Sequence, residues 1–153
     1  MMIAEPVRSA ARGFTIIELI VVIVIIGILL VVAAARLTGV DAFEVQAFFD
    51  STKSAVRFAQ KLAVAQRTNV VVVVGATSVS VCYTSPGCGS PVTDPTTGRA
   101  MRVSAPSGVS VSGPASVSFD GLGSATPGGT ITVNGGGMTR SLVIEQDTGY
   151  VHD

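Results

Sequence analysis

The apolar residues of the chain are concentrated near its N-terminus. Seventeen residues from Leu19 to Ala35 carry no charge, and the apolar stretch extends back to Phe14 with only Thr15 and Glu18 as polar interruptions. A helix of that extended length spans about 33 Å, which matches the hydrocarbon core of a bilayer. Valine and isoleucine favour strands in water, but a segment in lipid must satisfy its own backbone hydrogen bonds and becomes a helix. We therefore predict a transmembrane helix over residues 14–38.

Residues 39–69 predict a second, amphipathic helix. Apolar or small residues recur there every three or four positions, at Phe43, Ala47, Phe48, Ser51, Ala55, Ala59, Leu62 and Gln66, with Phe58 beside them. This stripe could dock on a sheet or lie on a membrane surface, and the mixed charges of the other face favour docking. Lys53, Arg57 and Lys61 are interpreted as a solvent-exposed row. Asp50 lies three positions before Lys53, within reach of it on a helix.

Residues 70–153 have the pattern of a β-rich domain. Five consecutive valines from Val70 to Val74 predict a strand that is buried on both faces. The alternation around Val79, Val81 and Tyr83 predicts a half-buried strand, followed by a long loop over residues 84–100. Further short strands are predicted at 101–104, 109–111, 117–119, 130–133, 140–145 and 150–151. The expected fold class is α+β, with a long N-terminal helix packed on a small, mainly antiparallel β domain.

The segment before the apolar run gives the chain a direction. Residues 1–13 contain Arg8 and Arg12, and this positive charge favours a cytoplasmic N-terminus with the remainder on the outer side. Ala33–Ala35 is similar to a signal-peptide cleavage site, so a removed secretory signal is the alternative. Glu18 argues against that alternative, because a carboxylate within an apolar segment is costly and implies a cationic partner in a helix bundle.

The run Gly13-Phe14-Thr15-Ile16-Ile17-Glu18-Leu19, followed by the long apolar stretch, resembles the N-terminus of type IV prepilins. The resemblance implies that residues 1–13 are a leader peptide, which prepilin peptidase removes by cutting between Gly13 and Phe14. It also implies N-methylation of the new amino terminus of Phe14. Glu18 would then compensate the amine of Phe14 on a neighbouring subunit during filament assembly.

A second resemblance covers the outer part of the chain. Residues 50–74, with SAVRFAQKLAVAQRTNVVVVV, together with Phe119-Asp120-Gly121 and Gly149-Tyr150-Val151, are similar to minor pilins of the type II secretion H-protein family and their FimT-like relatives. The run SAVRFAQKLAV is similar to minor pilins of mannose-sensitive haemagglutinin pili. The resemblance implies a pilin-like fold and a minor type IV pilin or pseudopilin that joins, initiates or caps a pilus or pseudopilus.

The same resemblances imply partners and a location. The partners are other pilin or pseudopilin subunits, the prepilin peptidase and an inner-membrane assembly platform. The protein would cross the inner membrane once, with a cytoplasmic N-terminus and a periplasmic C-terminal domain, and then enter the pilus or pseudopilus. The role within a secretion, adhesive, motility or competence filament is left open by the sequence.

The two cysteines, Cys82 and Cys88, are six positions apart with Pro86-Gly87 between them. Outside the cytoplasm such a pair is expected to be oxidised. A redox pair or a metal pair is the alternative, but the first favours a C-x-x-C spacing and the second needs further cysteine or histidine ligands. We predict a structural disulfide between these two residues.

Composition and charge give little sign of catalysis. Charged residues make up 13% of the chain, apolar residues 48%, and the formal net charge is zero, which excludes a disordered chain. The single histidine, His152, is interpreted as part of a frayed tail rather than as a catalytic base. Asp94 and Asp147 are interpreted as turn residues rather than calcium ligands. We expect neither an enzyme nor a cofactor or metal site.

DNA uptake is the alternative function, because some FimT-like pilins resemble DNA receptors with a basic C-terminal segment. Residues 39–153 carry seven lysines and arginines against eight aspartates and glutamates, and residues 149–153 contain no basic residue. Weak DNA binding is therefore expected. Arg99, Arg102 and Arg140 are the residues that could still form a basic cluster.

Overall fold

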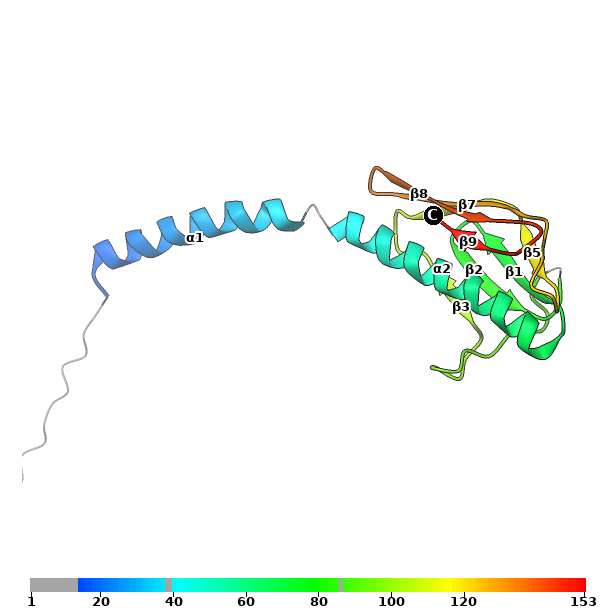
Figure 1. Ribbon diagram of the computed structural model, residues 1–153. Coiled ribbons are helices and arrows are strands. Elements are labelled where there is room, and N and C mark those ends of the chain that lie inside the picture. Colours follow the sequence, from blue (N-terminus) through cyan, green and yellow to red (C-terminus); the bar gives the residue numbers. More distant parts are fainter. Residues whose placement is uncertain (1–13, 38–39, 86) are drawn as a thin grey trace, which may run out of the picture. The chain divides into compact units, whose positions relative to one another are not determined.

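The computed structural model describes residues 14–37, 40–85 and 87–153. It divides the chain into two compact units, residues 1–39 and 40–153, which are described separately below (Figure 1). The predicted leader, residues 1–13, lies outside the described residues. The first helix ends at Leu37 and the second begins at Val40.

In helix α1 (Ile16–Leu37), every residue from Leu19 to Val31 is apolar. Its described side chains, from Phe14 to Val31, are all exposed, and that of Phe14 is 79% exposed. No helix in the described part of the chain combines the length and the apolar character that a membrane span requires. Because these described side chains are exposed, the apolar surface of α1 is not covered by other described residues of its own unit.

Helix α2 (Val40–Gln66) packs against the β domain. Its buried residues recur every three or four positions and are Val45, Phe48, Phe49, Thr52, Ala55, Val56, Ala59 and Ala63. The prediction that an amphipathic helix docks on a sheet is confirmed (Figure 1).

The predicted stripe of α2 was wrong in part. Phe43, Ala47, Ser51 and Gln66 are exposed, and the Phe43 side chain is 76% exposed. Alanines and phenylalanines lie on two overlapping rows along this helix. Their spacing in the sequence did not show which of the two rows is buried. The row that contains Val45 and Val56 is the one that faces the sheets.

The β domain consists of antiparallel strands in two sheets. A five-stranded sheet has the order β3-β2-β1-β5-β6, and a four-stranded sheet has the order β4-β7-β8-β9. The strands are β1 (Val70–Gly75), β2 (Ser78–Cys82), β3 (Arg102–Ser104), β4 (Ser110–Ser112), β5 (Ser116–Phe119), β6 (Ala125–Thr126), β7 (Gly129–Gly135), β8 (Met138–Ile144) and β9 (Val151–His152). The α+β prediction is confirmed. The two-residue strand β6 was not predicted.

Strand β1 lies at the centre of its sheet. Val72 is opposite Val81 of β2 on one side and Val117 of β5 on the other. Val70, Val71 and Val72 are buried, whereas the next two valines are only half-buried. Burial on both faces, as predicted from the five valines, therefore holds for the first half of the strand.

One core joins α2 to both sheets. Its largest fully buried side chains are Phe49 of α2, Phe119 of β5, Ile131 of β7 and Leu142 and Ile144 of β8. Burying each of these side chains stabilises the fold by about 1.5–3 kcal/mol. The second unit therefore has its own hydrophobic core.

Candidate functional site

The N-terminal end of α1 holds two of the predicted site residues. Thr15 stands just before the helix, and its Oγ1 accepts a hydrogen bond from the backbone N–H of Glu18 at 3.3 Å. This Thr-x-x-Glu arrangement is a helix-capping pattern, and the acid also suits the positive end of the helix dipole. The structure thus places the exposed Phe14 and Glu18 at the same helix end. Gly13 lies outside the described residues.

The remaining described surface of α1 offers apolar contact and little else. Between Phe14 and Val31 the polar side chains are those of Thr15 and Glu18. At Gly27 an added Cβ would meet no atom of this chain within 4 Å, so a second helix can approach closely there. This surface can pack against lipid or against other helices.

The disulfide prediction is confirmed. Cys82 at the end of β2 is bonded to Cys88, with their Cα atoms 5.3 Å apart. Gly87 and Cys88 both have positive φ angles, 79° and 61°, which the tight turn requires. The bond fixes the start of the 84–100 loop beside β2.

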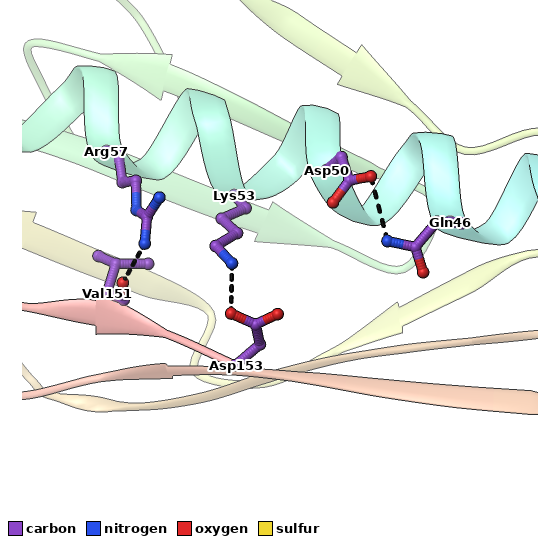
Figure 2. A network of polar contacts seen from close by, with 6 residues as sticks. All are labelled: Gln46, Asp50, Lys53, Arg57, Val151 and Asp153. Atoms are coloured by element: carbon purple, nitrogen blue, oxygen red, sulfur yellow. Dashed lines mark hydrogen bonds and ion pairs between the residues drawn. The ribbon is translucent and has the colours of Figure 1, made fainter.

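The C-terminus is held by the polar face of α2 (Figure 2). Lys53 forms an ion pair with the carboxylate of Asp153, and Arg57 Nη2 donates a hydrogen bond to the carbonyl oxygen of Val151 at 2.8 Å. Lys53 lowers the pKa of Asp153, chiefly through its hydrogen bond to the carboxylate. We call these four residues the C-terminal clamp.

The clamp corrects two predictions. Lys53 is not part of a solvent-exposed row, because its side chain is only 19% exposed and pairs with Asp153. The carboxylate of Asp50, which the sequence places within reach of Lys53, accepts a hydrogen bond from Gln46 Nε2 at 3.1 Å instead (Figure 2). His152 is not in a frayed tail, because it lies in β9, opposite Val143 of β8. Its Nε2 lies 3.2 Å from a carboxylate oxygen of Glu145.

Gln60 is a structural residue that the sequence did not single out. Its Nε2 donates hydrogen bonds to the carbonyl oxygens of Gly123 at 3.1 Å and Thr148 at 3.0 Å. Gly149 has φ +60°, and a Cβ there would collide with the carbonyl of Gly123. The glycine in the Gly149-Tyr150-Val151 run was visible in the sequence, but the two turns that meet at this point were not.

Asp94 is a turn residue, as predicted. Its carboxylate accepts hydrogen bonds from the Thr96 backbone N–H at 2.8 Å and from Thr97 Oγ1 at 3.0 Å. The Thr96 bond is the main reason that the pKa of Asp94 is lowered. In the described ranges, no group of three or more histidine, cysteine, aspartate or glutamate side chains is arranged to hold a metal ion.

The three arginines that could form a basic cluster belong to three different segments. Arg102 lies on β3, at an edge of the five-stranded sheet, and donates a hydrogen bond to Ser78 Oγ at 2.9 Å. Arg140 lies on β8, inside the four-stranded sheet. Arg99 is in the 84–100 loop. The fold therefore does not put Arg102 and Arg140 on one sheet.

Comparison with known families identifies two matching segments. Residues 8–34 match the prokaryotic N-terminal methylation motif. Residues 50–148, which include most of α2 and strands β1 to β8, match the family described as type II transport protein GspH.

One curated relative and two solved structures are similar to parts of the chain. A 56-residue stretch is 48% identical to the type IV narrow pilus major component PilA5 of Thermus thermophilus. That stretch covers 37% of this chain and 48% of the relative, so the chain spans about half the length of the relative. The type IV minor pilin FimU of Pseudomonas aeruginosa PAO1 has the same fold in one crystal form, with a TM-score of 0.56, 15% identity and coverage of 72% of this chain and 88% of that one. A second crystal form of FimU has a TM-score of 0.56 with 16% identity, covering 70% and 90%.

Proposed function

This chain belongs to the type II transport protein GspH family of minor pilins and pseudopilins, and we propose that it joins, initiates or caps a pilus or pseudopilus after prepilin peptidase processing. Membership of the family makes it a structural subunit that assembles with other pilins. The observation that carries the more specific proposal is the uncovered apolar surface of α1.

An apolar helix surface that is exposed to water is stabilised when lipid or other helices bury it. Each Å² of apolar surface left in water costs about 25 cal/mol, so the described face of α1 from Phe14 to Val31 strongly favours burial. Before assembly the inner membrane would provide it, with the N-terminus cytoplasmic and residues 40–153 in the periplasm. After assembly, the same helices of neighbouring subunits would provide it in the core of the filament.

Processing would prepare the N-terminal end of that helix. The methylation motif covers the Gly13–Phe14 bond, and cleavage there would leave a positively charged amine on Phe14 beside the positive end of the α1 dipole. Glu18, in the first turn of α1, supplies a negative charge at the same end. In an apolar filament core the carboxylate of one subunit and the amine of the next would neutralise each other, which would set the register between helices.

The β domain suits a location outside the cytoplasm. The Cys82–Cys88 disulfide closes a local loop and is stable in an oxidising compartment. The proposed partners are other pilin or pseudopilin subunits, the prepilin peptidase and an inner-membrane assembly platform.

Cleavage is tested by changing the residue before the cut. In the variant Gly13→Leu, we expect the peptidase to leave the precursor uncut, since the bulky side chain would occupy the position of the glycine hydrogen. The mass of the purified protein reads this directly, because the mature chain lacks residues 1–13 and begins with methylated Phe14. Gly27→Leu, within α1 and away from the cleavage point, is the control and should be processed normally. Normal processing of the Gly13→Leu variant would contradict the proposal.

A further inference from the structure

The edges of the two sheets differ in whether their outward backbone groups are bonded. In an antiparallel sheet, every second residue of an edge strand directs its N–H and C=O away from the neighbouring strand. On β4, β6 and β9 such a residue bonds within the chain, through Val111 N–H to Ala76 O, Ala125 N–H to Gln146 O, and Arg57 Nη2 to Val151 O. The chain itself therefore covers part of these three edges.

The outer edge of β3 is open. The carbonyl of Met101 and the N–H of Ala105, on either side of this strand, both bond on the β2 side. Because the direction alternates along a strand, Arg102 and Ser104 direct their backbone groups outward. Among the described residues, none bonds to these outward groups. We call Arg102 and Ser104 the β3 edge.

Strand β8 is open along part of its length. All seven of its residues pair with β7, but only the last two pair with β9, and the β7–β8 hairpin continues past this point (Figure 1). Glu145 donates its N–H to the Tyr150 carbonyl, so the odd-numbered residues of β8 face the β9 side. Thr139 and Ser141 thus have outward backbone groups to which no described group bonds. We call Thr139 and Ser141 the β8 edge.

The β3 edge and the β8 edge match each other. Each has two outward residues separated by one inward residue. An antiparallel register that sets Arg102 opposite Ser141 and Ser104 opposite Thr139 uses all four outward residues. Each of these two pairs would exchange two backbone hydrogen bonds. An added strand is therefore the partner that satisfies both edges.

The same register sets Arg140 opposite Val103. Val103 lines two hollows between β3 and α2, whose charged lining residues are Glu44, Asp50 and Asp94. Arg140 is exposed, and no ion pair joins it to a described residue. In the paired sheet it would lie on the α2 side of β3, where opposite charge favours the contact. Arg102 points to the other face of β3, where it bonds to Ser78.

We propose that the β3 edge of one copy pairs with the β8 edge of a second copy of this chain. Both halves of the contact are present in one chain, and the pairing would join the five-stranded sheet of one copy to the four-stranded sheet of the next. It goes beyond the proposed function, which rests on packing between the α1 helices.

The positions of the two edges determine what the contact builds. The edges belong to different sheets and share no residue, so each copy can use both at once. A contact between two different surfaces continues from copy to copy and does not close a symmetric dimer. A filament requires this kind of contact.

Site-specific disulfides test the pairing in the full chain in membranes. One copy carries Ser104→Cys, a second copy with a different tag carries Thr139→Cys, and the two are co-expressed and mildly oxidised. Opposite residues of such a pair have Cα atoms about 5.5 Å apart, which a disulfide can span. We expect linked pairs of the two tagged copies, with the 104–139 bond identified by mass spectrometry. Thr130→Cys, exposed on β7, replaces Thr139→Cys in the control and should give no link.

A proline variant tests whether the backbone makes the contact. Ser141→Pro removes the outward N–H of residue 141 and leaves the bonds of the even-numbered residues to β7 in place. We expect it to lower the yield of the 104–139 link at least about fivefold, whereas Ser141→Thr should keep the yield. Formation of the Cys82–Cys88 disulfide in each variant checks that the domain has folded.

A charge variant tests the position of Arg140. Arg140→Glu should lower the yield of the link about threefold, and Arg140→Lys should keep it. A link that neither Ser141→Pro nor Arg140→Glu weakens would overturn the pairing. The pairing is also wrong if the 104–139 link does not form, if the Thr130→Cys control links equally well, or if Ser104→Cys links only to a different protein.

The outcome is separable from that of the proposed function. A chain that is processed and enters filaments but gives no 104–139 link overturns only the strand pairing. A chain that gives this link but never enters filaments supports the pairing and counts against the proposed function.

Discussion

At the scale of single residues, the β domain depends on a few close approaches between turns. Gln60 of α2 bonds to the carbonyls of Gly123 and Thr148, and Gly149 lies directly against Gly123. Three segments that are distant in sequence therefore meet at a point where no side chain fits. This explains why the fold needs glycine at position 149.

The variant Gly149→Ala tests that explanation. Its Cβ would collide with the Gly123 carbonyl and its φ would be in the left-handed region, so we expect a loss of at least about 2 kcal/mol in unfolding free energy. Gly98→Ala is a matched control, because Gly98 has a similar φ of +67° but no atom within 4 Å of an added Cβ. That variant should lose only about 1 kcal/mol. Chemical denaturation measures both, and equal losses would show that the close approach is unimportant.

The C-terminal clamp should make stability depend on pH. Lys53 lowers the pKa of Asp153, so the folded state binds this proton less readily than the unfolded state, whose carboxyl titrates near pH 4. The stabilisation is then present above about pH 4 and disappears as the pH falls through the lowered folded-state value.

The variant Asp153→Asn measures the contribution of this carboxylate. Its denaturation midpoint should be below that of the unchanged protein at pH 7 and should converge with it towards pH 2. In a Lys53→Gln background the same substitution should have a much smaller effect at pH 7, because only the charge of Arg57 remains to favour the carboxylate. A difference that persists at pH 2 would assign the effect to something other than the carboxylate charge.

Sequence reasoning identified residues whose partners are close along the chain. Cys82 and Cys88 are six positions apart and Asp94 bonds to the residues just after it, so local spacing was informative. Lys53 instead pairs with Asp153, 100 positions away. A nearby carboxylate, Asp50, was the reasonable choice from a helix pattern, and only the pairing of β9 with β8 brings the distant one into reach.

At the scale of elements, the sequence located the strands better than it located the buried face of helix α2. The sequence placed most strands within one or two residues. Alternation with a period of two was informative where one face is buried, as in β4 and β5. Strand β6 has two residues and cannot show a period. On α2, apolar residues occupy more of the circumference than the sheets cover, so the pattern predicted the docking but not the orientation of the helix.

Two alanines on α2 report which face is buried. Ala59 is fully buried, whereas Ala47 is exposed although the sequence pattern placed it on the same stripe. Ala59→Leu should destabilise the domain by about 1–3 kcal/mol through overpacking. Ala47→Leu should change stability by less than about 0.5 kcal/mol. Thermal unfolding measures both changes in stability. A larger loss for Ala47→Leu than for Ala59→Leu would show that Ala47 lies on the buried face, as the sequence pattern predicted.

At the scale of the whole molecule, the two units carry different requirements. Residues 40–153 have a core of their own, a disulfide and a held C-terminus. The described part of α1 has none of these and exposes nearly every apolar side chain that it contains. Family membership explains this division, because a subunit that assembles must leave surface for its neighbours.

The charge of Glu18 should matter for assembly and not for the helix itself. In Glu18→Ala the backbone N–H of residue 18 still bonds to Thr15 Oγ1, since the side chain takes no part in that bond, and α1 keeps its start. The Phe14 amine of the neighbouring subunit would lose its partner in an apolar core, which lowers incorporation at least about tenfold. Glu18→Gln should be equally impaired because it keeps the shape and removes only the charge, whereas Glu44→Ala on α2 should assemble normally. Immunoblots of sheared filaments and of membranes give the ratio of assembled to unassembled protein for each variant. Incorporation of Glu18→Ala at the level of the unchanged protein would show that no such pairing sets the register.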